Sequence, residues 1–366
     1  MSQVTKPMML DETGKRIADA LDLGNALLSA MAKGDVDANI TDLGYIHDIV
    51  RKGLAPKLFN IGDQIIVPWK DVAADITYDV PLNVVHFGNV TLKDGSVVPG
   101  MYLQWHYCSP FGVQFDAKEN EVATEGIFGS DYSYYTAYTN DKGETAYKLL
   151  VEGTDYTVGA AIPTNDTYYH TAIKDTTGNV VRYGYNRWSH SALRQYLNSK
   201  KGVNEWWEAQ HLGDMPPEQL ATKAGFMTGF GEDFLSIIQP VKVTTALNTV
   251  TDKDLGDRED TYDTFFLPSL EQMYAKNQLA GAEGEYFEYW KRATGLTTPA
   301  VWYEAGRNPG YIHYAINAKT SAQHVRLRSA GRIYSYNAWP VPTPGNINEY
   351  YGAYSAFRFA PVCVIC

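Results

Sequence analysis

The side chains best suited to metal binding or acid–base catalysis are scattered along this chain. Its eight histidines include no pair at the H-x-x-x-H or H-E-x-x-H spacing, which would bring two imidazoles to one face of a helix. Positions 105–108, Trp-His-Tyr-Cys, set a histidine near a cysteine, but a single histidine beside aromatic residues in a strand is typical of the core. Phosphate-loop and nucleophile-elbow patterns are absent. We therefore predict no enzyme active site and no cofactor.

Two further groups of ligand-type residues remain. Acidic residues gather between positions 252 and 260 around Gly256, but no glutamate falls where a calcium loop closes, so we interpret the segment as a solvated loop and leave a metal ion open. Three cysteines, Cys108, Cys363 and Cys366, are an odd number without the spacing of a disulfide framework. The terminal C-x-x-C has no second pair, which favours a structural interpretation.

Charge and hydropathy limit the class of partner. The net charge is −11 with no basic cluster, and nucleic-acid binding needs a positive surface to neutralise phosphates. No apolar run has the length of a signal peptide or a membrane span. We expect a protein made in a bacterial cytoplasm without a signal peptide, with no nucleic-acid partner and no membrane insertion.

The most unusual feature of the composition is its 27 tyrosines and 8 tryptophans. Tyrosine combines a large contact area with few rotatable bonds and a polar tip, and Tyr, Ser, Gly and Asn dominate antibody binding loops. Near the C-terminus, Pro340, Pro342 and Pro344 alternate with other residues, so an extended chain puts them on one face. Each proline removes a ladder donor, which favours an exposed edge or loop over a central strand. The predicted ligand-binding residues are Ile333, Tyr334, Ser335, Tyr336, Pro340, Pro342, Pro344, Ile347, Tyr350, Tyr351, Tyr354 and Ser355. The alternative is aromatic packing in a β-rich core.

Hydrophobic periodicity and turn residues predict a mixed architecture. A helix is expected over 11–33 and a second helical stretch over 40–56, ending before Pro56. Short strands follow at 65–67, 83–85, 101–105, 148–151 and 180–183, with later helices at 189–197 and 267–278. This divides the chain into a helical module, residues 1–58, for oligomerisation or attachment, and a β-rich α+β domain, residues 59–366.

Three stretches together resemble a family found in phages and prophages. They are residues 183–199, which contain Asn-Arg-Trp-Ser-His-Ser-Ala-Leu; residues 225–270, which end in Phe-Phe-Leu-Pro-Ser-Leu; and Val-Arg-Leu-Arg-Ser at 325–329 with Pro-Val-Cys-Val-Ile at 361–365. This order resembles the C-type-lectin-like fold of formylglycine-generating enzymes and of variable proteins made by diversity-generating retroelements, such as major tropism determinant-like receptor binders.

The resemblance implies a rigid scaffold whose last strands and loops tolerate wholesale side-chain change. Adenine-directed mutagenesis of asparagine codons reaches Tyr, Ser, Pro and Gly but not Lys, Gln or Met, and residues 328–366 contain none of these last three. Trp339 and Glu349 are not reachable either and are expected to be fixed in the template. The resemblance also implies a homotrimer, a place in the virion at a phage tail or fibre tip, and N-terminal contacts with other tail proteins.

These observations favour a phage or prophage receptor-binding protein that recognises a bacterial cell-surface protein or glycan. Two alternatives stay open. One is an enzyme on the same fold, which requires a deep polar pocket with convergent acid and base groups. The other is a structural virion protein without variable binding, whose C-terminal tyrosines are buried between subunits.

Overall fold

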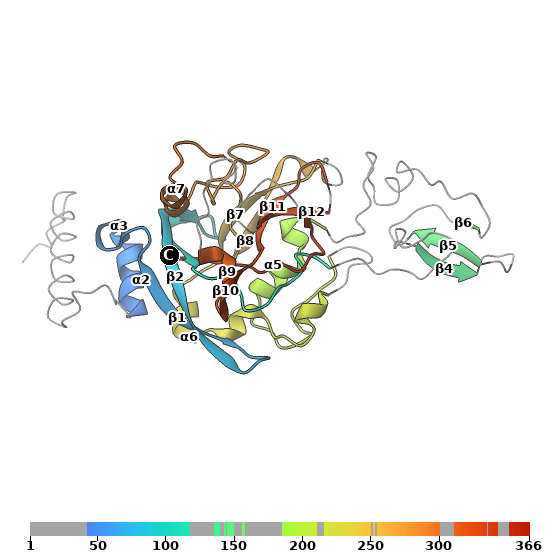
Figure 1. The fold of residues 1–366 in the computed structure, drawn as a ribbon, viewed down its shortest axis with the longest axis horizontal. Helices are drawn as coiled ribbons and strands as arrows, with labels where there is room; N and C mark the ends of the chain where they lie inside the picture. The colour runs from blue at the N-terminus through green and yellow to red at the C-terminus, as the bar shows by residue number, and fades with distance from the viewer. Residues whose placement is uncertain are drawn as a thin grey trace, which may run out of the picture.

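The computed structural model describes residues 42–117, 135–139, 143, 145–149, 156–157, 185–210, 216–249, 252, 255–300, 311–334, 336–342 and 351–366. Within these residues the chain is a mixed α+β structure of short helices and small antiparallel sheets (Figure 1), which confirms the predicted class. The helix expected over 11–33 and the strand expected at 180–183 lie outside the described residues.

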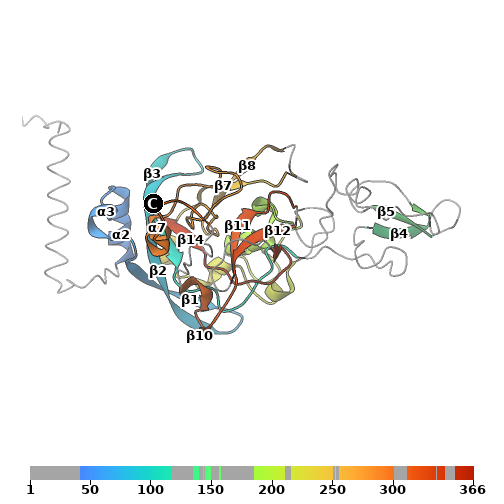
Figure 2. The same ribbon diagram turned by 45° about the horizontal axis from the view of Figure 1, so that its top comes forward.

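The largest sheet joins the beginning of the described chain to its C-terminus (Figures 1 and 2). Its order is β1 (Gln64–Asp71), β2 (Ile76–Thr91), β3 (Val97–Trp105) and β14 (Val362–Ile365), all antiparallel. Exposed and buried residues alternate in β1 because successive strand side chains point to opposite faces. Every residue of β14 is buried, so the end of the chain is part of the core. The strands predicted at 65–67, 83–85 and 101–105 are confirmed.

Two helices precede this sheet. Helix α2 (Leu43–Arg51) begins after Asp42, whose carboxylate accepts a hydrogen bond from the N–H of Tyr45, and it confirms the helix expected within 40–56. The helix ends at Arg51, before Pro56 as expected, and a second short helix that was not predicted, α3 (Ala55–Leu58), follows it. Proline fits the first turn of a helix, where no N–H partner is needed.

The middle of the chain forms smaller sheets and helical turns around β14. The sheets pair β7 (Val241–Ala246) with β8 (Arg258–Asp263), β9 (Tyr314–Ala315) with β10 (Ala318–Ala322), and β11 (Val325–Ala330) with β12 (Asn337–Val341) and β13 (Tyr351–Gly352). Bridges from Ile238 to Ile365 and from Phe266 to Val362 attach this part to β14. The helical turns are η1 (Trp188–His190), α5 (Ala192–Leu197), η2 (Glu218–Leu220), η3 (Phe226–Gly229), α6 (Glu232–Leu235), α7 (Glu288–Thr294) and η5 (Tyr311–His313).

Two predicted helices differ from the structure. The helix expected to start at Ser189 begins at Ala192, because Ser191 is the residue whose hydroxyl accepts the N–H of Arg194. The segment 267–278 forms buried turns instead of a helix. There the side chain of Glu271 accepts the N–H groups of Gly281 and Glu283, so a polar side chain organises the loop that apolar spacing alone assigned to a helix.

A separate antiparallel sheet consists of β4 (Tyr135–Thr139), β5 (Thr145–Leu149) and β6 (Tyr156–Thr157). The strand predicted at 148–151 overlaps β5, and positions 150–151 lie outside the described residues. The N–H of Tyr185 donates to the buried carboxylate of Asp116 at 2.8 Å, so two described segments far apart in the sequence, one ending at Ala117 and one beginning at Tyr185, lie side by side.

Candidate functional site

The predicted ligand-binding residues gather on two neighbouring segments, the 331–337 loop and the β13 turn at 351–355. Ala353 links the segments, because its N–H donates to the carbonyl of Tyr336 at 2.7 Å. Ile333 is 55% exposed and Tyr354 41%, while the other members are half-buried. We call these residues the display surface; they are Ile333, Tyr334, Tyr336, Tyr351, Tyr354 and Ser355. Ser335, Pro344, Ile347 and Tyr350 were predicted for the same site and lie outside the described residues.

The expectation that the prolines form an exposed edge is wrong for two of them. Pro340 and Pro342 are buried, and Pro340 lies in β12, the middle strand of its sheet, opposite Arg326. A proline is accepted here because, among the described residues, β13 pairs only with Asn337 and Ala338, and β11 is the one strand that pairs with β12 at Pro340. Pro340 therefore lies in the buried part of the sheet that carries the display surface, and Pro342 is buried directly after it.

The 331–337 loop is held from below by a buried amide. Asn186 is fully buried, and its Nδ2 donates to the carbonyl oxygens of Gly331 (3.2 Å), Tyr334 (2.6 Å) and Asn337 (2.8 Å). The loop also closes on itself, since the N–H of Gly331 donates to the carbonyl of Asn337 at 2.7 Å. All these bonds end on main-chain atoms, so none of them depends on the side chain at positions 333, 334 or 336.

A chain of buried polar groups continues behind Asn186. Asn248 donates to the side-chain oxygen of Asn186 at 3.0 Å and to the carboxylate of Asp252 at 2.8 Å, and the hydroxyl of Tyr185 also donates to Asp252. Burial raises the pKa of Asp252 to about 6, against the opposing effects of the Tyr185 hydrogen bond and of Arg187. The solvated acidic loop expected at 252–260 is therefore wrong for Asp252, which is 2% exposed.

The β13 turn is held by a buried arginine. Arg326 is fully buried, and its guanidinium donates to the carbonyl oxygens of Ala338 (2.8 Å), Tyr351 (3.4 Å), Gly352 (3.1 Å) and Ser355 (3.0 Å). Burial lowers its pKa to about 9. A buried charge is expensive unless hydrogen bonds compensate it, and here main-chain carbonyls accept from both Nη1 and Nη2, while Nε has no partner among the described residues. As with Asn186, these hydrogen bonds go to main-chain oxygens and do not involve the side chains of the turn.

The tyrosines of the display surface differ in how firmly they are packed. The Tyr351 ring lies 5.3 Å from that of Phe357 and 5.6 Å from that of His324, in edge-on arrangements. The rings of Tyr334 and Tyr336 contact each other at 5.9 Å. Tyr354 lies over Gly352, where an added Cβ would collide with the ring. Tyr351 is thus partly packed against other aromatic side chains, as the alternative to a binding surface predicts. Ile333 and Tyr354, in contrast, face outward.

Burial also restricts the predicted variable region, residues 328–366. Residues 328–331 and 359–366 are buried. The buried guanidinium of Arg328 donates to the carbonyls of Leu267 (2.7 Å) and Glu283 (2.7 Å), and the positive charge of Arg328 opposes a burial-induced rise in the pKa of Glu283. Within the described residues, the outward-facing part is the loop and the turn between these buried ends.

The other sequence candidates do not assemble into a reactive site. Cys108 is fully buried, and burial raises the pKa of its thiol to about 12. Cys363 and Cys366 are buried free thiols, and burial raises the pKa of both. Across the described ranges, no three His, Cys, Asp or Glu side chains are grouped to hold a metal ion. No helix in those ranges is long and apolar enough to cross a membrane.

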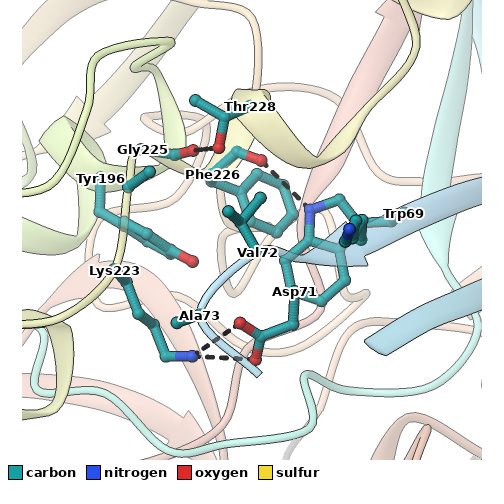
Figure 3. Close-up of a pocket in the computed structure, with 11 residues that line it drawn as sticks. Trp69, Asp71, Val72, Ala73, Tyr196, Lys223, Gly225, Phe226 and Thr228 are labelled. Carbon is teal, nitrogen blue, oxygen red and sulfur yellow. Dashed lines mark hydrogen bonds and ion pairs between the residues drawn. The ribbon is translucent and has the colours of Figure 1, made fainter. Parts of the chain in front are cut away.

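One small pocket lies between the end of β1 and α5 (Figure 3). Asp71, Tyr196 and Lys223 converge there, and Lys223 donates to both carboxylate oxygens of Asp71 at 2.9 and 3.0 Å. The cavity has about 200 Å³ of space, including its mouth. Pockets for small-molecule ligands usually measure about 300–1,000 Å³. The acid and base groups that an enzyme needs are close together here, but a substrate has little room.

Comparison with known proteins places this α+β chain, with its display surface and buried anchors, in a family. A family model described as a domain of unknown function (DUF6273) matches residues 165–365, more than half of the chain, and the chain belongs to this family. The matched range includes β14 but not β3. In this chain the last strand of the family domain, β14, therefore pairs with a strand that lies outside the matched range. No curated protein and no solved structure matches the chain.

The predicted ligand-binding residues include the tyrosines of the display surface, but they do not include the residues that hold the main chain of this surface. Asn186 and Arg326 both lie in stretches on which the family resemblance was based, yet no role was assigned to either. The sequence does contain a pattern that points to Arg326 as such a residue. Arginine alternates with Val325, Leu327 and Ser329 in β11, a strand whose residues are all buried. A charged residue in such a strand indicates a buried anchor when both strand faces are covered.

Proposed function

We propose that this chain is a ligand-binding protein that presents changeable side chains on a fixed main chain, and that it acts as a phage or prophage receptor-binding protein. The observation that carries the proposal is the main-chain anchoring of the display surface. Asn186 and Arg326 between them bond seven carbonyl oxygens of the described loop, strand and turn, three and four respectively. Side chains there can change without loss of these bonds, as a diversified binding site requires.

The C-type-lectin-like fold is part of the same proposal. It is supported by the pairing of the last strand, β14, with β3, and by the small separate sheet β11-β12-β13 that carries the display surface. A retroelement origin makes a genetic prediction: a near-identical template repeat of the 328–366 coding region and a reverse transcriptase gene lie next to this gene. Absence of both from the neighbouring DNA would refute the retroelement origin and leave ligand binding to be tested on the protein.

Ligand binding rests on exposed apolar and aromatic anchors. Truncating an interface anchor typically costs ~2 kcal/mol or more, which is roughly a 30-fold loss of affinity. The ligand is a bacterial surface protein or glycan in this proposal, and a homotrimer would strengthen weak individual contacts by multivalency. In this proposal the protein acts in the virion, at a phage tail or fibre tip, as the resemblance implies.

The test uses labelled full-length protein and a panel of bacterial strains in flow cytometry. Ile333→Asp and Tyr354→Ala should each reduce cell binding by at least tenfold while the melting temperature stays within about 1 °C, because both side chains face outward. Val203→Asp is the matched control, since Val203 is a 45% exposed apolar residue elsewhere in the chain. Equal binding by all three variants and the wild type, or equal loss in the control, would refute the display surface.

A further inference from the structure

The loop between β7 and β8 lies against the display surface, on a side where no ligand-binding residue was predicted. The N–H and the hydroxyl of Thr249 both donate to the carbonyl of Arg332, at 2.7 and 2.9 Å. In return, the guanidinium of Arg332 donates to the carbonyl of Leu247 (3.0 Å) and to the carbonyl (3.2 Å) and carboxylate (2.8 Å) of Asp257. Because Arg332 directly precedes Ile333, the β7–β8 loop and the loop that carries Ile333 form one hydrogen-bonded unit.

The β7–β8 loop presents a large apolar side chain to solvent. Leu255 is 55% exposed, the same fraction as Ile333. It lies in an open turn, since its N–H donates to the carbonyl of Asp252 at 2.9 Å and the next residue, Gly256, has a φ of 98°. Single exposed apolar residues are common on soluble proteins, but several on one joined surface mark an interaction site. Leu255, Ile333 and Tyr354 are three such residues on linked segments.

The polar side chains that join these segments already have partners within the protein. Asn186 and Asn248 are buried, and their amides bond each other, main-chain carbonyls and Asp252. The side chain of Arg332 is 12% exposed and is paired with Asp257. A glycan presents mostly hydroxyl groups, which need free polar partners to replace the hydrogen bonds that they lose to water. An apolar patch of a protein needs no such partners and gains by burying the exposed leucine, isoleucine and tyrosine.

We propose that Leu255 is a constant contact beside the changeable display surface, and that the ligand is a bacterial surface protein with an apolar patch rather than a glycan. This inference rests on the proposed receptor-binding function. Leu255 lies outside residues 328–366, so diversification of that region leaves it unchanged. A standard protein interface covers about 800 Å² on each partner, which is enough to include both neighbouring loops. Every version of the display surface then keeps the same apolar neighbour.

The first experiment compares substitutions in the full-length protein by flow cytometry on bacterial cells. Leu255→Asp should reduce cell binding about tenfold or more, because complex formation would bury its carboxylate against apolar groups. Its melting temperature should stay within about 1 °C of the wild type, since the side chain is exposed in the free protein. Leu255→Ala, which adds no charge, should reduce binding in the same direction. Val203→Asp is the control and should bind like the wild type.

Comparison with Ile333→Asp separates this inference from the function on which it rests. If Ile333→Asp loses binding while both Leu255 variants bind like the wild type, the constant contact is overturned and the display surface stands. If Ile333→Asp and the Leu255 variants all bind like the wild type, the proposed function fails, and this inference fails with it.

The second experiment identifies the class of ligand. Bacteria are treated either with proteinase K, which digests surface proteins, or with sodium periodate, which oxidises the vicinal diols of glycans. Binding of the wild-type protein should fall about tenfold or more after proteinase K and stay unchanged after periodate. Binding that survives proteinase K, or that periodate abolishes, overturns the assignment of a protein ligand.

Discussion

Replacing Asp252 with asparagine should raise the free energy of unfolding at neutral pH, because it removes a buried carboxylate that is unfavourable when ionised. Asp252 is 2% exposed, and its carboxylate accepts from Tyr185 and Asn248. Burial raises its pKa from 3.8 to about 6 in the folded state. In the unfolded chain the carboxyl returns to its ordinary pKa, so the folded state binds the proton more tightly. Stability from this group is therefore complete below about pH 4 and is lost as the pH rises through 6.

The size of this effect follows from the shift. A shift of about 2 pKa units, at 1.36 kcal/mol per unit, gives roughly 3 kcal/mol at pH 7.5. With an unfolding entropy of about 2.1 cal/mol/K per residue, a chain of 366 residues changes its melting temperature by about 4 °C for that free energy. Asparagine retains an oxygen to accept from Asn248 and gains an N–H to donate to the Tyr185 hydroxyl, so the shape of the site is preserved.

The measurement is the melting temperature of wild type and Asp252→Asn between pH 4 and pH 8. At pH 7.5 the variant should melt about 4 °C above the wild type, and the difference should shrink as the pH falls below 6. The ionised carboxylate would instead be a net stabilising group if Asp252→Asn melted lower at pH 7.5, or if the two proteins showed the same pH dependence. Either result would refute the argument from burial.

Three other substitutions or reagents probe the anchors and the core. Arg326→Met should lower stability by about 3 kcal/mol or more, measured by denaturant unfolding, because four carbonyl oxygens lose their buried donor; a loss below 1 kcal/mol would mean that water replaces the guanidinium. Gly352→Ala should displace the Tyr354 ring and reduce binding to cells at least as much as Tyr354→Ala does; unchanged binding would show that this ring is not a contact. Thiol labelling of Cys108 should require unfolding, since burial raises its pKa to about 12, and rapid labelling of Cys108 in the native protein would contradict its packing.

The strands that sequence reasoning predicted correctly are those whose pattern is local. The alternation at Ile65 and Val67 identifies β1, and the apolar run at 101–105 identifies β3. Both patterns can be read from a few neighbouring residues, without knowledge of the tertiary structure. The turn-forming 267–278 segment was misassigned for the complementary reason. Its apolar spacing fits a helix, but the Glu271 side chain reaches Gly281 and Glu283, and such contacts leave no periodic signal.

By itself the sequence determined the mixed α+β class, the early strands and the concentration of tyrosines near the C-terminus. Only the tertiary structure decided which of these tyrosines face outward, that Pro340 and Pro342 are buried, and that Asn186 and Arg326 hold the loop and turn through main-chain carbonyls. The physical reason is distance along the chain. Asn186 meets its loop across about 150 residues, and exposure depends on which distant segments cover a side chain, so no local pattern encodes either fact.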